Sequence, residues 1–391
     1  MADTAQAQLS AIHALNPSGL RVVLVLQGGG ALGAYQAGVY QALHEHQLAP
    51  DWIVGTSIGA INAAILAGND NTTRLARLQE FWQRISHPDS IDLRALSDTQ
   101  RRSSIQLQTW DTLLRGVPGF FTPRWFNPFA TGMTVPAEQA SFYDTSPLHD
   151  TLSELVDFDY LNAPGGTRLT VNALQVQSGT LRRFDNRELN ITADHIRASG
   201  ALPPGFPAVR IDGELYWDGG LYSNTPLETV LEDPDKVDTL CFMVDLWSAD
   251  GAEPTTLDEV QTRQKDVTFA SRSQRHLEDY VAAHQVRQKL RALYQALPDA
   301  AKTDDHAREL AALGCDSTLH IVRLPYAGRD WHMASKDINF SRGSTQWRWE
   351  QGYRDGLRAI QAAGWLSFVS EDTPLVVHEL PPLATGGPST A

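Results

Sequence analysis

The feature that most constrains the fold is an apolar run that leads directly into a glycine-rich segment. Arg21–Leu26 reads RVVLVL, a continuous run of β-branched residues and leucine that is typical of a strand buried on both faces. It is followed by Gly28-Gly29-Gly30-Ala31-Leu32-Gly33, after which we expect a helix over Ala34–His46. The order strand, glycine loop, helix is typical of α/β folds.

Strand-like and helix-like segments continue to alternate along the chain. We expect strands over Asp51–Val54, Leu169–Val176, Leu181–Phe184, Val237–Leu246 and Thr318–Leu324, a hairpin over Ala208–Trp217, and helices over Ile58–Ala67, Thr73–Ile85, Leu257–Leu297 and Trp347–Ala363. This pattern predicts an α/β protein with three layers, α/β/α, and a mainly parallel central sheet.

The balance of acidic and basic residues limits the classes of molecule that the protein is expected to bind. The 391 residues include 46 acidic and 32 basic side chains, a net charge of −14 with histidine neutral. Such a surface repels nucleic-acid phosphates and disfavours tight docking on anionic bilayers. The first twenty residues lack a signal peptide, and two cysteines form no disulfide framework, so we expect a cytoplasmic protein. A peripheral contact with membranes or with lipid or polyester inclusions stays open, as does the oligomeric state.

The glycine loop by itself permits a dinucleotide-binding interpretation. It satisfies G-x-G-x-x-G between a strand and a helix, and Asp51 lies 18 residues after Gly33. However, a ribose-binding acid belongs at the end of the second strand, whereas Asp51 begins that strand. A nicotinamide-dependent dehydrogenase is therefore a distant alternative.

A second glycine motif occupies the end of the second strand. Gly55-Thr56-Ser57-Ile58-Gly59 is G-x-S-x-G, placed between a short apolar strand and a helix rich in alanine. This is the context of a nucleophile elbow, whose tight turn needs glycine at Gly55 and Gly59 and presents the Ser57 hydroxyl at a helix N-terminus. A plain helix N-cap at Ser57 is the structural alternative.

An ester hydrolase also needs donors for a tetrahedral oxyanion and a base for the serine proton. The consecutive amides of Gly28, Gly29 and Gly30 are candidate donors, although the run could be only a tight turn. None of the twelve histidines has an obvious catalytic context. The candidate base is Asp218, which leaves a strand end into Gly219-Gly220, with an ordinary turn aspartate as the alternative.

These segments together resemble the patatin-like phospholipase family. The family's ordered blocks read here as Gly28-Gly29-Gly30, Gly55–Gly59, Ala198-Ser199-Gly200-Ala201-Leu202-Pro203 and Asp218-Gly219-Gly220. The resemblance implies a Ser–Asp dyad, with Ser57 as nucleophile and Asp218 as general base, and neither metal nor cofactor. Many relatives carry Arg or Lys within the glycine loop where this chain has Leu32, which casts doubt on phospholipid as the preferred substrate.

The resemblance also implies a domain organisation. We expect an N-terminal arm over 1–20, a patatin-like catalytic domain over 21–230, a helical C-terminal extension over 231–369 that packs on it, and a flexible tail over 370–391. Val244–Ser248 and Ser335–Arg342 look like blocks of a bacterial subgroup with such an extension. Ser335–Arg342 could line a ligand or a subunit contact, or could simply begin a helix.

An irregular, aromatic insertion is expected over residues 86–165. Its aromatic side chains could form an acyl pocket or an interfacial lid, or could be ordinary core; they are Trp110, Phe120, Phe121, Trp125, Phe126 and Phe129.

Three functional classes stay open. A serine-dependent lipid acyl hydrolase of phospholipase A or lysophospholipase type is expected first. An esterase for neutral acyl esters or stored hydroxyacid polyester comes next, and a non-catalytic lipid-binding protein last.

Overall fold

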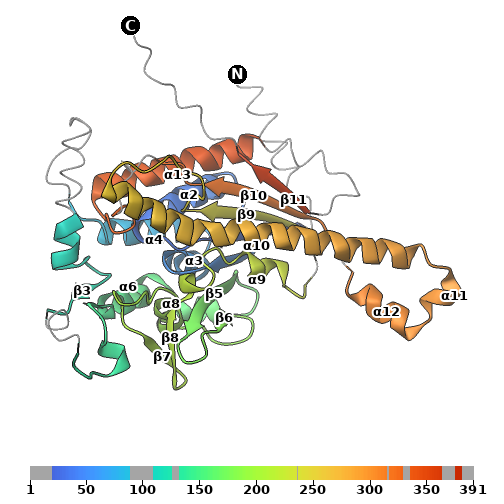
Figure 1. Ribbon diagram of the computed structural model, residues 1–391, viewed down its shortest axis with the longest axis horizontal. Coiled ribbons are helices and arrows are strands. Elements are labelled where there is room, and N and C mark those ends of the chain that lie inside the picture. Colours follow the sequence, from blue (N-terminus) through green and yellow to red (C-terminus); the bar gives the residue numbers. More distant parts are fainter. Residues whose placement is uncertain are drawn as a thin grey trace, which may run out of the picture.

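A computed structural model describes residues 20–88, 109–125, 132–235, 237–314, 317–328, 335–362 and 375–380. Its centre is a sheet of nine strands in the order β11-β10-β9-β1-β2-β5-β8-β7, with β6 paired to β5 (Figure 1). The strands are β1 (Arg21–Leu26), β2 (Trp52–Gly55), β5 (Arg168–Gln175), β6 (Leu181–Asp185), β7 (Val209–Ile211), β8 (Glu214–Asp218), β9 (Thr239–Asp245), β10 (Leu319–Pro325) and β11 (Leu375–Glu379).

The middle of the sheet is parallel and its neighbouring strands end at the same edge. β1 pairs with β2 on one side and with β9 on the other, so that Leu26 lies beside both Gly55 and Val244. β5 is parallel to β2, whereas β8 runs antiparallel to β5. Because the carboxyl ends of parallel strands meet, the segments that follow β1 and β2 converge at one edge of the sheet.

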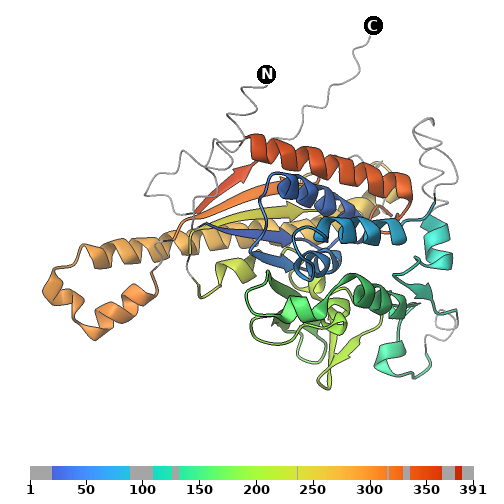
Figure 2. The ribbon, with the colours of Figure 1, turned by 180° about the vertical axis from the view of Figure 1, so that it is seen from behind.

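Helices cover both faces of the sheet, which confirms the expected α/β/α architecture. Figure 1 shows α10 across one face, and Figure 2 shows α2 and α13 across the opposite face. The helices around the sheet are α2 (Ala34–Glu45), α3 (Ile58–Ala67), α4 (Arg74–Arg84), α8 (Ala193–Ser199), α9 (Leu227–Leu231), α10 (Leu257–Gln295) and α13 (Arg342–Gln361). The strand residues alternate between two apolar cores, since Leu24 packs toward α2 and α3, and Val25 packs toward α9.

Smaller elements complete the described chain. They are the short helices α6 (Ser146–Leu155), α7 (Phe158–Asn162), α11 (Asp299–Lys302) and α12 (Asp305–Ala312), the turns η1 (Gly30–Gly33), η4 (Ala137–Gln139) and η5 (Gly219–Leu221), and the hairpin of β3 (Thr122–Pro123) with β4 (Tyr143–Asp144). The end of α10 projects from the body and carries α11 and α12 (Figures 1 and 2). Of the helices described, none is both long and apolar enough to span a bilayer.

Most predicted elements occur within a few residues of their expected bounds, but the C-terminal part differs in two respects. The prediction of a flexible tail from residue 370 is wrong for Leu375–Glu379, which forms β11 on β10. The apolar run Leu375–Val377 pairs with the otherwise open edge of β10, although prolines and glycines lie near it in the sequence. In addition, β9, β10 and β11 continue the sheet of the N-terminal part, so the boundary expected at 230 does not separate two sheets.

The last helix also begins earlier than the expected Trp347. Ser341 is its N-cap and α13 starts at Arg342. This helix lies against α2 with backbones in close contact, because glycines face each other across the interface. A Cβ added to Gly38 would overlap the carbonyl of Trp349, and one added to Gly352 would overlap the carbonyl of Tyr35.

We therefore expect Gly352→Ala to destabilise the protein. Alanine normally favours a helix over glycine by about 1 kcal/mol, but here the methyl group would force two helix backbones apart, and overpacking of this kind costs about 1–3 kcal/mol. Urea unfolding should show a lower free energy of unfolding. Gly166→Ala is the control, since a Cβ there meets only ordinary contacts at 3.6 Å. A Gly352→Ala protein as stable as the control variant would contradict the close packing.

Candidate functional site

Ser57 lies at a strained turn between β2 and α3. Its backbone has φ 58° and ψ −125°, a combination that a non-glycine residue adopts at a cost. The flanking glycines have no room for a side chain: a Cβ on Gly55 would overlap the Gly59 carbonyl, and one on Gly59 would overlap the Leu26 carbonyl. The sequence therefore folds into the geometry of a nucleophile elbow, rather than an ordinary N-cap.

The elbow is held by a residue of the helix α8. The backbone N–H of Ser57 donates to the Ser199 hydroxyl at 3.0 Å, and Ser199 is fully buried. Gly200, the next residue, lies against the Ser57 backbone, since a Cβ on it would be 3.9 Å from the Ser57 Cα. The Ala198–Pro203 block thus lies against the turn that carries Ser57, and part of it lines the same cavity.

Asp218 lies at the end of β8 and is buried, with 3% of its surface exposed. Its carboxylate accepts a hydrogen bond from the Gly220 amide at 2.7 Å. Burial raises the pKa of Asp218 to about 7, although the Gly220 amide and the nearby Ser57 side chain act to lower it. A carboxyl group with this pKa can accept a proton near neutral pH, which an ordinary aspartate does poorly.

The turn after Asp218 also holds the glycine loop. Asn224 donates from its side-chain amide to the Gly28 carbonyl at 3.1 Å, and its own backbone carbonyl accepts from the Gly28 N–H at 3.1 Å. Gly28 therefore uses its N–H within the protein, which corrects the expectation that all three glycines are free donors. Among the described residues, the amides of Gly29 and Gly30 donate to no protein group, and they flank the cavity beside Ser57.

A cavity of about 280 Å³ brings these groups together. Ser57, Asp218 and the glycine loop line it together with many aromatic and aliphatic side chains and a few polar ones, among them Thr112, Asn224 and Asp337. The aromatic and aliphatic lining residues are Ile58, Ile61, Leu113, Phe120, Phe121, Tyr143, Leu202, Phe206, Trp247, Phe269, Ile338 and Phe340. No histidine, lysine or arginine is among the described residues that line it.

The aromatic residues expected to form an acyl pocket fall into three groups. Phe120 and Phe121 are buried and line the cavity, where they contact Phe206 with ring centroids 5.9 and 5.1 Å away. Trp110 and Trp125 are instead exposed and are not lining residues. Phe126 and Phe129 lie outside the described residues. Of the four predicted pocket aromatics that the structure describes, Phe120 and Phe121 line the cavity and the two tryptophans do not.

Several lining residues carry no signal of a pocket role in the sequence. Trp247 follows β9, Phe269 lies on α10, and Ile338 and Phe340 precede α13. All four lie beyond residue 231, and nothing local distinguishes them from core residues. The resemblance of Val244–Ser248 and Ser335–Arg342 to a family subgroup was the one available indication. Ser335–Arg342 thus both lines the cavity and begins a helix.

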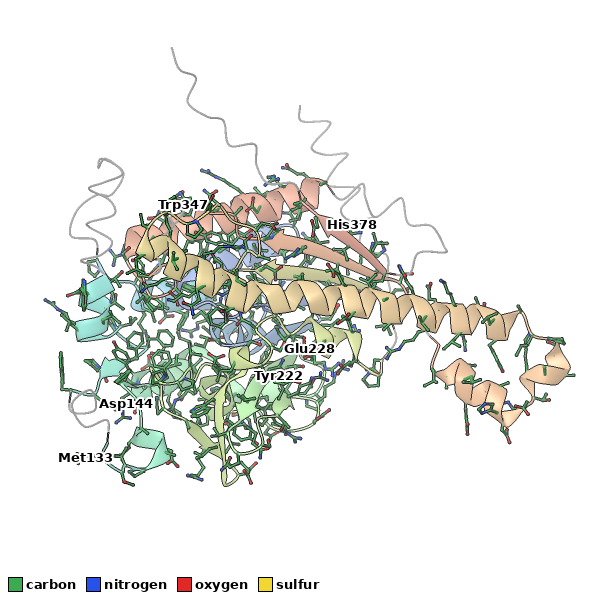
Figure 3. All side chains as sticks on the ribbon, viewed as in Figure 1. Met133, Asp144, Tyr222, Glu228, Trp347 and His378 are labelled. Atoms are coloured by element: carbon green, nitrogen blue, oxygen red, sulfur yellow. The ribbon has the colours of Figure 1, made fainter. Side chains whose placement is uncertain are left out.

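Asp51, the candidate ribose-binding residue of a dinucleotide site, has a structural role in the fold. The Asp51 carboxylate accepts from the Val22 amide at 2.7 Å, at the start of β1, so it lies at the opposite edge of the sheet from the glycine loop. Figure 3 shows Tyr222, just after η5, below α10; this residue is 54% exposed, so the turn that carries Asp218 continues to the surface.

Within the described part of the chain, no three His, Cys, Asp or Glu side chains are grouped as metal ligands.

The chain matches known proteins across the region that builds this site. A family model described as patatin-like phospholipase matches residues 24–231, more than half of the chain. A second model, described as patatin phospholipase, matches residues 267–372 and includes α13 with the segment before it.

Several curated proteins are similar to part of this chain. Lysophospholipase NTE1 of Candida glabrata is 30% identical over 239 residues, 61% of this chain and 11% of that protein. Triacylglycerol lipase SDP1L of Arabidopsis thaliana is 36% identical over 76 residues, 19% of this chain and 9% of that protein. Neuropathy target esterase sws of Drosophila melanogaster is 25% identical over 217 residues, 54% of this chain and 12% of that protein. The match thus spans only about a tenth of each relative.

One solved structure, that of VipD from Legionella pneumophila, aligns with a TM-score of 0.36 at 15% identity. The alignment covers 88% of this chain and 67% of that one.

Proposed function

The chain belongs to the patatin-like phospholipase family, and we propose that it is a serine-dependent lipid acyl hydrolase with Ser57 as nucleophile and Asp218 as general base. The observation that carries the proposal is the placement of Ser57, at a strained elbow, beside the buried Asp218 carboxyl group on the wall of one cavity. No described histidine lines the cavity beside this pair, and its other carboxyl group, Asp337, is paired with Lys265, which favours Asp218 as the base.

The geometry supports a two-step reaction through an acyl-enzyme. Ser57 Oγ attacks the ester carbonyl carbon while its proton passes to Asp218. The resulting oxyanion accepts hydrogen bonds from the Gly29 and Gly30 amides, and the C–O bond breaks as Asp218 returns the proton to the leaving alcohol. Water then gives a proton to Asp218 and attacks the acyl carbon. The bond between Ser57 Oγ and the acyl carbon breaks, the acid leaves, and the proton passes from Asp218 to Oγ, which restores the Ser57 hydroxyl and the Asp218 carboxylate.

Substitution of the dyad tests the proposal. We expect Ser57→Ala and Asp218→Asn each to lose at least about a thousandfold in kcat toward p-nitrophenyl esters, because triad-type residues act as a unit. A fluorophosphonate probe should label the wild type and fail to label Ser57→Ala. Ser153→Ala, an exposed helix serine, is the matched control and should keep full activity. Hydrolysis or labelling that survives Ser57→Ala would refute Ser57 as nucleophile.

The pKa of Asp218 gives a distinct pH dependence. The base works only when deprotonated, so kcat/KM should fall about tenfold per pH unit below a midpoint near 7 and level off above it. An aspartate at its ordinary pKa of about 3.9 would give full activity down to about pH 5. A pH profile of kcat/KM for an uncharged ester measures the midpoint, and a midpoint below about 5 would contradict the buried base.

The lining of the cavity favours an uncharged acyl ester over an anionic phospholipid. No described lining residue is cationic, and the Asp218 carboxylate, which must be deprotonated to act as a base, would repel a phosphate. Leu32, where many relatives carry a cation, is fully buried in the apolar core. The net charge of −14 adds a repulsion that acts at longer range.

A head-group series with one acyl chain tests this preference. We expect kcat/KM for monoacylglycerol to exceed that for lysophosphatidylglycerol by at least about tenfold, with lysophosphatidylcholine between them. Added salt separates the effect of the net charge from that of the cavity lining. A concentration of about 0.5 M NaCl screens the long-range repulsion by the net charge, but not the interactions inside a cavity that excludes water. Discrimination that persists in salt supports the cavity as its source, and equal rates for the three esters would contradict the preference.

A further inference from the structure

The segment before α13 is in direct contact with the glycine loop. The Asp337 carbonyl accepts from the Ala31 amide at 2.8 Å. Gly30 has φ +55° and faces the same carbonyl so closely that a Cβ would overlap it. The backbone from the C-terminal part therefore lies against the residue whose amide is proposed to hold the oxyanion.

A buried arginine holds this segment, residues 335–341, by hydrogen bonds to its backbone. Arg348 of α13 has no exposed surface and donates to the Lys336 carbonyl at 2.8 Å and to the Asn339 carbonyl at 3.0 Å. The Asn339 side chain in turn accepts from the Ser341 amide at 3.1 Å. A fully buried guanidinium bound to two carbonyls leaves the segment little freedom.

Two crossed ion pairs join the segment to α10. The Lys265 ammonium lies 2.8 and 2.9 Å from the two carboxylate oxygens of Asp337, and the Lys336 ammonium lies 2.5 Å from Asp266. Each partner thus contributes a consecutive lysine and aspartate, and each lysine meets the aspartate of the other element. The four side chains are 12–36% exposed, so water screens these pairs less than pairs on an open surface.

A second contact from the same region holds the other end of the loop. The indole N–H of Trp247 donates to the Gly28 carbonyl at 2.8 Å, and the Lys336 ammonium lies 4.9 Å from the centroid of the Trp247 ring system. Gly28 and Ala31 flank Gly29-Gly30, and both are hydrogen-bonded to groups beyond residue 231. The orientation of the two free amides therefore depends on the position of the C-terminal part.

We infer that Lys265 and Asp337 are positioning residues, whose ion pair holds the Asp337 carbonyl on the Ala31 amide and so orients the Gly29 and Gly30 amides toward the oxyanion. The catalytic consequence of this inference rests on the proposed function. The restraint of the glycine loop by the Asp337 carbonyl does not depend on catalytic activity. Oxyanion donors stabilise a transition state only if they are already oriented, so a loosened loop lowers kcat more than it alters substrate binding.

The test combines hydrogen exchange with kinetics on the full chain. The variants are Lys265→Met, Asp337→Asn, the double variant, and Lys265→Arg, which keeps the charge. The matched control is Arg183→Met on β6, which removes the ion pair of Arg183 with Glu232 (2.6 Å) just after α9, away from the loop. Amide exchange is read in a peptide over residues 27–34, and kcat and KM are measured with an uncharged p-nitrophenyl ester.

We expect Lys265→Met and Asp337→Asn each to speed exchange over residues 27–34 at least about fivefold. We expect kcat to fall about tenfold to a hundredfold, less than the loss of a whole donor, with KM within about twofold. The double variant should match the single ones, because both remove one interaction. Lys265→Arg should retain most of kcat, and Arg183→Met should leave both readouts unchanged.

Unchanged exchange in both single variants would overturn the inference, as would losses that add in the double variant. The failure of the proposed function has a different signature: Ser57→Ala would then keep its activity, while exchange over residues 27–34 would still respond to Lys265→Met. Faster exchange together with an unchanged kcat would also overturn the inference, because the hold on the loop would then have no catalytic effect.

Discussion

The parallel pairing of β1 with β2 and with β9 determines where every group of the site lies. The register places Leu26 beside Gly55 and Val244, so the three strands end together. The glycine loop, the elbow and Trp247 follow these ends directly, and the antiparallel β8 brings Asp218 to the same place through its pairing with β5. A shift of one residue between strands would move side chains to the wrong face and separate Ser57 from Asp218.

Burial then changes the chemistry of the groups so placed. Asp218 is enclosed, and the loss of water raises its pKa to about 7, the property that the proposed base needs near neutral pH. Two contacts maintain the strained backbone of Ser57: the close packing around Gly55 and Gly59, which leaves no space for a side chain, and the hydrogen bond to the Ser199 hydroxyl. Neither group would have these properties as a free residue, so the site is a consequence of packing as much as of residue type.

The C-terminal part is integral to the site rather than an addition to it. Its strands β9, β10 and β11 continue the sheet, and without them β1 would be an edge strand with two apolar faces. The same part supplies Phe269, Ile338 and Phe340 to the cavity and contacts the glycine loop at both ends. The α2–α13 interface, with its facing glycines, fixes the segment before α13 against the body.

The sequence by itself determined the alternation of strands and helices, the elbow at Ser57 and the placement of Asp218 after a strand, because each depends on local periodicity and on glycine at tight turns. It could not show that Leu375–Glu379 completes the sheet, since a five-residue strand depends on the edge it meets. Only the tertiary structure decided which amides of the glycine loop are free, which aromatics line the cavity and that the pKa of Asp218 is raised. Those properties arise from residues distant in the chain, such as Asn224, Phe340 and Asp337, and burial and hydrogen bonding exist only once these are brought together.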